Sequence, residues 1–123
     1  MIKTLLLVGF GGAIGSILRY LTHWLTSKYF QGTFPLSTFL VNVLGSLLIG
    51  LFIGYLGKYF SENHPLKFLL IVGFCGGFTT FSTFANENLQ LIQSGNYTIA
   101  LVYMLLSVVL GVLGVWLGIF LFK

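Results

Sequence analysis

The sequence predicts an all-α membrane protein with four transmembrane helices, and three observations support this fold class. First, 57% of the 123 residues are hydrophobic and only 7% are charged, whereas soluble domains carry about 25% charged residues. Second, four apolar segments each exceed the ~20 residues that a helix needs to cross the hydrocarbon core. Third, the connections are short. We therefore expect residues 1–123 to form a single transmembrane domain.

The four segments follow one another along the chain with only tight loops between them. Because short loops make successive helices run in opposite directions, we expect both termini on one side of the membrane. The formal net charge of +4 comes from scattered Lys and Arg residues, several of them near segment ends as in membrane anchors, so nucleic-acid binding is not indicated. The segments span residues 4–26, 34–57, 66–92 and 97–122.

Each segment contains a pair of glycines four residues apart. Such pairs allow close approach of helix backbones in lipid, where no hydrophobic effect drives association. We expect a tightly packed bundle, and we expect an oligomer because four helices alone can hardly shield a polar path on all sides. The pairs are Gly11/Gly15, Gly50/Gly54, Gly73/Gly77 and Gly114/Gly118.

The third segment contains the stretch GGFTTFSTF at residues 76–84, which is rich in poor helix formers. This composition predicts a break over residues 76–80. Irregular backbone at membrane depth must be buried in protein or line a wet cavity, and broken helices of this kind build ion sites. The alternative is an unbroken, glycine-packed helix whose hydroxyls bond to its own carbonyls.

Polar residues inside the segments are candidate functional residues, because such groups are costly in lipid. Arg19 either snorkels to the interface or attracts anions in an aqueous vestibule. Asn42 either holds an anion with its amide or bonds to a neighbouring helix. Thr38 is expected to cap or start the second helix. Glu87 either reaches the interface, pairs with a cation or takes up a proton.

Phe81 and Phe84 are three residues apart, so they share one face of a helix. The edge of an aromatic ring is electropositive. A dehydrated anion that meets ring edges and hydroxyl donors is therefore partly compensated without a fixed positive charge to trap it. The alternative is that both rings serve packing, which is the usual role of Phe in a chain with 13 of them.

The stretch at residues 76–84 closely resembles the GGxTTFSTF signature of the Fluc (CrcB) family of fluoride channels. The run GGAIG at residues 11–15, then Arg19 and Tyr20, and the run FPLSTFLVNVLGS at residues 34–46 agree with this family in order, except that Ser37 replaces the usual Gly. The resemblance covers essentially the whole chain. It implies a small multi-pass channel of the bacterial inner membrane that exports fluoride passively to relieve fluoride toxicity.

The resemblance also implies an antiparallel, dual-topology dimer with two pores, and a role for each motif residue. Phe81 and Phe84 would form a phenylalanine box that faces the other subunit's pore, and Arg19 would be the vestibule cation. Backbone carbonyls of Gly76 and Thr79 from both subunits would hold a structural Na⁺ at the dimer interface. The polar track would consist of Asn42, Ser82, Thr83, Tyr103 and Ser107.

Three alternatives to a fluoride channel are two other classes of membrane protein and an enzyme. A small multidrug transporter needs a carboxylate deep in the first helix, whereas this helix holds Arg19, and the only acids are Glu62 and Glu87. A structural or regulatory membrane subunit would not explain Asn42, Arg19 or the broken helix. An enzyme is not indicated, because no nucleophile–base or metal constellation is present.

The distribution of Lys and Arg bears on orientation in the membrane. A homodimer of antiparallel copies requires nearly balanced charge on the two sides, since each copy must insert either way. Here the side of the termini has more positive charge, so a homodimer and a pair with an oppositely oriented partner subunit both remain open, and we favour the homodimer. Lys3, Lys58, Lys67 and Lys123 lie on the side of the termini, and Lys28, with Arg19, lies on the other.

Overall fold

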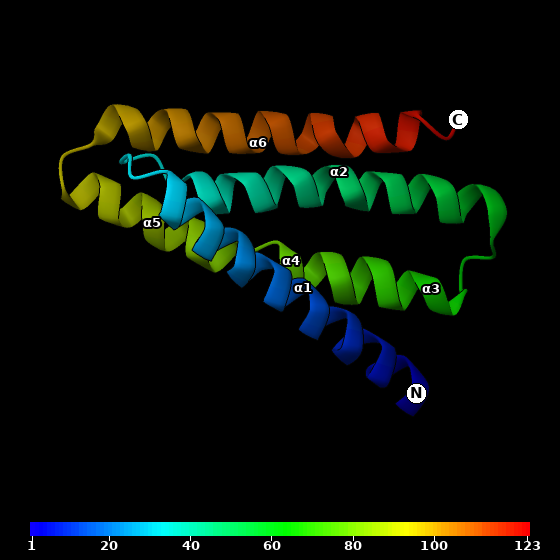
Figure 1. The fold of residues 1–123 in the computed structure, drawn as a ribbon. Helices are drawn as coiled ribbons and strands as arrows, with labels where there is room; N and C mark the ends of the chain where they lie inside the picture. The colour runs from blue at the N-terminus through cyan, green and yellow to red at the C-terminus, as the bar shows by residue number, and fades with distance from the viewer.

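The computed structural model describes all 123 residues and forms a bundle of four long helical segments without a strand. All four are long and apolar enough to cross a membrane, so the predicted fold class is confirmed. Figure 1 shows the N- and C-termini at the same end of the bundle, as the short loops predict. The segments are α1 (Ile2–Tyr29), α2 (Leu36–Tyr59), the composite third segment (Pro65–Gln93) and α6 (Tyr97–Phe120).

The third segment is broken, but over a shorter stretch than predicted. Its first half continues as helix through Gly76 and Gly77 to Phe78, and only Thr79 and Thr80 leave the helix, with φ/ψ of −88°/157° and −149°/123°. These extended values suit β-branched residues. The pieces are α3 (Pro65–Lys67), the π-helical η1 (Phe68–Cys75), α4 (Gly76–Phe78) and α5 (Phe81–Gln93).

Gly73 and Gly77 of the third segment serve helix packing more than helix breaking, whereas a Cβ added at Gly76 would meet nothing within 4 Å. α1 crosses η1 and α4 so closely that a Cβ added at Gly11 or Gly15 would overlap the carbonyl oxygen of Leu69 or Phe74, and one at Gly73 would lie 2.7 Å from the Val8 oxygen. Small residues permit this approach, which keeps α4 helical. The contact between α2 and α6 is built in the same way, at Gly50 and Gly118.

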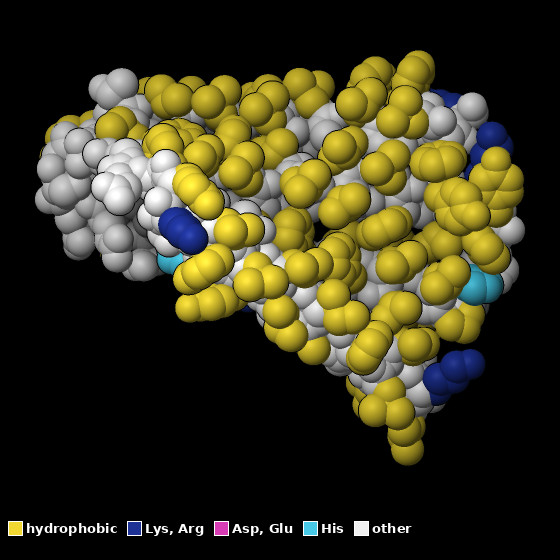
Figure 2. Space-filling model, viewed as in Figure 1, with side chains coloured by type: hydrophobic (Ala, Val, Ile, Leu, Met, Phe, Trp, Pro, Cys, Tyr) yellow, Lys and Arg dark blue, Asp and Glu magenta, His cyan; other side chains and the backbone are white.

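Most of the apolar surface faces outward. Only 15 of the 123 residues are buried within one chain, so its hydrophobic core is small and lipid or a partner must cover the remaining apolar surface. Figure 2 shows apolar side chains over most of one face, with Lys or Arg side chains only toward its two ends. This distribution is that of a membrane-spanning surface.

Candidate functional site

Asn42 of α2 holds the broken backbone of the third segment in place. The backbone N–H of Thr80 donates to Asn42 Oδ1 at 2.8 Å, and Asn42 Nδ2 donates to the Thr80 carbonyl at 3.0 Å. One amide side chain thereby replaces both backbone hydrogen bonds that Thr80 loses to the break. Of the two alternatives for Asn42, the bond to a neighbouring helix is the one that the structure contains.

The two half-helices that meet at the break are capped from inside the bundle. Arg19 Nε donates to the Gly77 carbonyl at 3.0 Å, and a cation is favourable at a helix C-terminus. The Thr80 hydroxyl accepts from the Thr83 amide at 3.3 Å and so caps the start of α5. Arg19 therefore does not snorkel toward the interface, because its guanidinium is bound to the break.

A cavity of about 510 Å³ lies open beside the break. The backbone carbonyl of Thr79, which lies outside the helices, accepts no backbone hydrogen bond, and both Gly76 and Thr79 line this cavity. Phe81, which also lines it, is 78% exposed. The rings of Phe81 and Phe84 are 5.9 Å apart between centroids, so the pair is close together, but in a single chain it borders an open surface.

A second cavity, of about 220 Å³, lies between α1, α2 and the start of α5. Thr80 lines both this cavity and the larger one, so the break separates the two. Most of the residues around the smaller cavity are polar, which distinguishes it from the apolar exterior. They are Arg19, Tyr20, His23, Ser37, Thr38, Val41, Thr80 and Thr83.

Glu87 joins three elements through hydroxyl groups, which the sequence did not reveal. The Thr38 hydroxyl donates to Glu87 Oε2 at 2.9 Å, and the Tyr103 hydroxyl donates to Oε1 at 2.8 Å. The prediction that Thr38 caps or starts α2 is wrong in its first alternative: α2 begins at Leu36 without a side-chain cap, and the buried Thr38 turns to Glu87 instead. Of the three roles left open for Glu87, none included two hydroxyl donors.

Glu87 also borders a third cavity, of about 410 Å³, near the end of α5 and the start of α6. This cavity has polar walls that include Gln90, Ser94 and Asn96. The carboxylate therefore lies between polar space at the end of the bundle and Thr38, which lines the cavity of about 220 Å³. The bond between Glu87 and Thr38 thus joins the walls of two polar cavities.

The other residues predicted for the polar track lie in different surroundings. Tyr103 is fully buried, and its ring meets that of Phe84 edge to face at 5.0 Å between centroids. Thr83 lies within 3.1 Å of the Thr80 hydroxyl, while Ser82 is exposed at the start of α5. The hydroxyl of Ser107 is buried and has no hydrogen-bond partner, although a buried hydroxyl ordinarily has one.

The chain has clear relatives over nearly all of its length. The family model described as CrcB-like protein, Camphor Resistance (CrcB), matches residues 6–119. The chain is 52% identical over 121 residues to the fluoride-specific ion channel FluC of Flavobacterium psychrophilum, covering 98% of each protein. It is 52% identical over 119 residues to the FluC protein of Phocaeicola vulgatus, covering 95% of this chain and 96% of the relative. It is 46% identical over 123 residues to that of Campylobacter jejuni, covering both proteins completely.

Proposed function

This chain belongs to the CrcB-like family, and we propose that it is a fluoride-specific ion channel of the bacterial inner membrane. It lets fluoride leave the cell passively and so relieves fluoride toxicity. The observation that carries this proposal is the broken third segment, because Asn42 holds irregular backbone next to polar cavities inside a membrane bundle. Irregular backbone at this depth is tolerated where it lines a cavity, and it is of no use to a purely structural subunit.

The channel is an antiparallel homodimer with two pores. In one chain, the cavity beside the break is open and Phe81 is 78% exposed, so a second copy is needed to enclose both. Such a pairing places the rings of Phe81 and Phe84 at the pore of the other subunit, where their electropositive edges face the ion. Within each chain, α1 packs on η1 and α4, and α2 packs on α6. These contacts leave the surface around Phe81 free for contact with a second copy.

The polar track of each pore consists of Asn42, Ser82, Thr83, Tyr103 and Ser107, and Arg19 serves as the vestibule cation. The contacts within the chain define how these donors work. Asn42 Nδ2 uses one of its two N–H groups on Thr80 and can offer the other to an anion. Tyr103 has a single hydroxyl proton, which it uses in the hydrogen bond to Glu87. The hydroxyl group must therefore turn away from Glu87 before it can donate a hydrogen bond to fluoride.

A structural Na⁺ at the dimer interface is held by the backbone carbonyls of Gly76 and Thr79 from both subunits. The donor set fits such an ion, because hard cations prefer oxygen ligands, the Thr79 carbonyl accepts no backbone hydrogen bond within the chain, and both residues line the cavity beside the break. Neutral carbonyls without a carboxylate suit a monovalent ion. No cluster of His, Cys, Asp or Glu that could hold another metal is present. When bound, the ion supplies fixed positive charge at the centre of the dimer.

The function can be tested by growth in fluoride. Bacteria that lack their own fluoride exporter should grow in fluoride when they express this chain, and they should remain sensitive when they express the Phe81→Ile variant at the same level in the membrane. Continued sensitivity with well-expressed wild-type chain would contradict the proposed export of fluoride.

The dual orientation can be tested by labelling intact cells. A single Cys in the loop between Lys58 and Pro65, introduced after replacement of Cys75, should react with a membrane-impermeant reagent in about half of the molecules, since each orientation is equally populated. Complete labelling, or none, would show one orientation and would favour pairing with a partner subunit. The same measurement at a Cys in the loop after Tyr29 should give the complementary fraction.

A further inference from the structure

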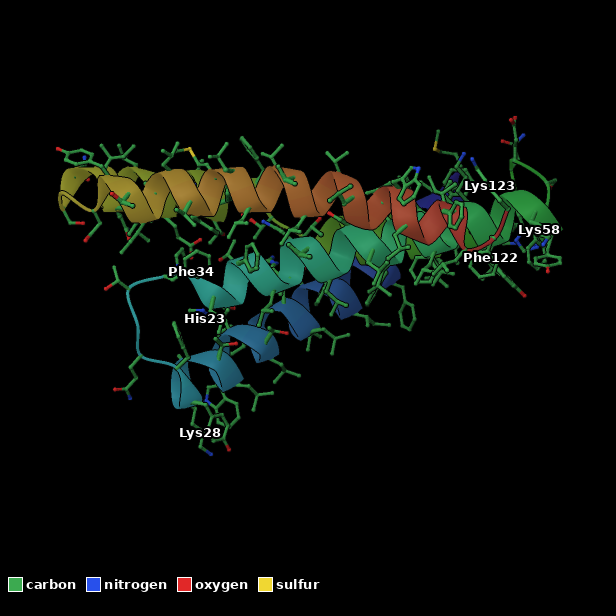
Figure 3. The ribbon with its side chains drawn as sticks, turned by 90° about the horizontal axis from the view of Figure 1, so that it is seen from above. His23, Lys28, Phe34, Lys58, Phe122 and Lys123 are labelled. Carbon is green, nitrogen blue, oxygen red and sulfur yellow. The ribbon has the colours of Figure 1, made fainter.

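His23 shares the cavity of about 220 Å³ with Arg19. The two residues are four apart on α1, so they lie on the same face. Hydroxyl residues from α2 and α5, including Thr38 and Thr83, complete the walls. Figure 3 shows His23 on the side of α1 toward Phe34 and the start of α2, and Lys28 at the end of α1.

No carboxylate lines this cavity. On α1 the other ionisable groups are Arg19 and Tyr20 in the cavity wall, Lys28 and Tyr29 beyond it, and Lys3 at the far end of the helix. Lys28 Nζ lies over the ring of Trp24 at 5.3 Å. α2 contributes only hydroxyl and apolar residues to the wall: Ser37, Thr38 and Val41.

The remaining ionisable groups that face this region come from α5 and α6. Glu87 of α5 lies one turn beyond Thr83, and its two oxygens already accept from Thr38 and from Tyr103 of α6. Those bonds come from neutral hydroxyls and leave the charge of Glu87 in place, but Glu87 does not line the cavity. A protonated imidazole at His23 would therefore add positive charge to a wall that contains no carboxylate. An anion that enters the cavity would then be attracted by both Arg19 and His23.

We propose that His23 is a second, titratable cation of this cavity and that its protonation strengthens the binding of fluoride on its way into the pore. This inference rests on the proposed channel function. An imidazole changes charge between about pH 5 and 8, so the added attraction is present on the acid side of this range and is lost as the pH rises. For charges about 7 Å apart in an effective dielectric of about 40, Coulomb's law gives roughly a 5- to 10-fold change in apparent affinity.

Fluoride efflux from liposomes that contain the purified full chain tests this role. The same pH is set on both sides, at about 5.5 or about 7.5 on either flank of the imidazole range, at fluoride concentrations below saturation. Protein-free liposomes at each pH correct for passage of HF through lipid. We expect wild-type efflux to be about 5-fold faster at the lower pH, His23→Gln to lose this stimulation, and His23→Arg to be fast at both values.

His64 supplies a matched control. It is the only other histidine, and its Nδ1 accepts from the Leu66 amide at the start of α3, away from the cavity. His64→Gln should keep the acceleration by acid. Acceleration that persists in His23→Gln, or that disappears in His64→Gln, would overturn the assignment.

A titration of the His23 ring by NMR, in detergent-solubilised wild-type protein, provides a readout that does not depend on transport. Because binding linkage is reciprocal, saturating fluoride should raise the midpoint of the His23 titration by about 0.7 pH, which corresponds to a ~5-fold coupling, and leave that of His64 in place. If the wild type conducts no fluoride, the proposed function fails and this titration still decides the role of His23. A midpoint of the His23 titration that fluoride does not move would overturn the role proposed for His23.

Discussion

Replacing Asn42 with Ala should destabilise the break in the third segment. The substitution removes an acceptor 2.8 Å from the Thr80 amide and a donor 3.0 Å from the Thr80 carbonyl. No other hydrogen bond is present for these two backbone groups. Interhelical hydrogen bonds in membranes contribute about 0.6–1.7 kcal/mol each, so the loss of both should cost about 1–3 kcal/mol.

This cost should be localised at the break, and hydrogen exchange can measure it there. Opening at Thr80 should become about 5- to 150-fold more frequent, which is the equivalent of 1–3 kcal/mol, and the Thr80 amide should exchange faster by that factor. Amides in the middle of α6 should change much less, because they take no part in these bonds. Unfolding in detergent provides the corresponding global measurement.

Ser46→Ala is the matched control for this experiment. Ser46 is one turn along α2 from Asn42 and donates only to the Asn42 carbonyl of its own helix, at 2.7 Å. Its removal leaves no backbone group of the break without a partner, so Thr80 exchange should stay within about 2-fold of wild type, in keeping with a weak local bond. Unchanged exchange at Thr80 in Asn42→Ala would refute the bridging role of Asn42.

Three further substitutions test packing, the pore and the carboxylate. Gly15→Ala should lower the free energy of unfolding by about 1–3 kcal/mol because its Cβ would overlap the Phe74 carbonyl, whereas Gly9→Ala, with nothing within 4 Å of the added atom, should be neutral in the same unfolding experiment. Phe81→Ile should cut fluoride efflux at least ~10-fold if its ring edge contacts the ion, with dimer assembly measured by cross-linking as the control; full efflux would remove Phe81 from the pore. Glu87→Gln should lower the free energy of unfolding by about 1–3 kcal/mol, because the new amide N–H group would face one of the two hydroxyl donors. An unchanged free energy of unfolding would mean that both hydroxyls find other partners.

The four helices could be predicted from the sequence because length and apolar content alone decide whether a segment spans a membrane. The break was also predictable, since Thr79 and Thr80 combine β-branching with hydroxyls. Its extent was not, because Gly76 and Gly77 are poor helix formers in isolation, yet Gly77 packs against the backbone of α1, and this contact overrides helix propensity. The π-helical turn before the break also gave no pattern in the sequence.

Pairings between side chains on different helices were the least predictable part of the site. Asn42 could be singled out as a costly intramembrane amide, but its pairing with the Thr80 backbone depends on how α2 and the third segment are rotated. The same holds for Glu87, whose partners Thr38 and Tyr103 come from helices that are distant in sequence. The roles predicted for the Phe pair, the polar track and the carbonyls of Gly76 remain predictions, because they involve a second copy of the chain or bound ions.

Fluoride efflux from liposomes that contain only this purified chain tests the central claim most directly. A fluoride electrode in the external solution would follow release from fluoride-loaded liposomes, and a chloride electrode would follow a parallel set loaded with chloride. We expect rapid, passive release of fluoride that needs no proton gradient, and chloride release no faster than from protein-free liposomes. Fluoride release at the protein-free rate, or equal release of both anions, would contradict the account.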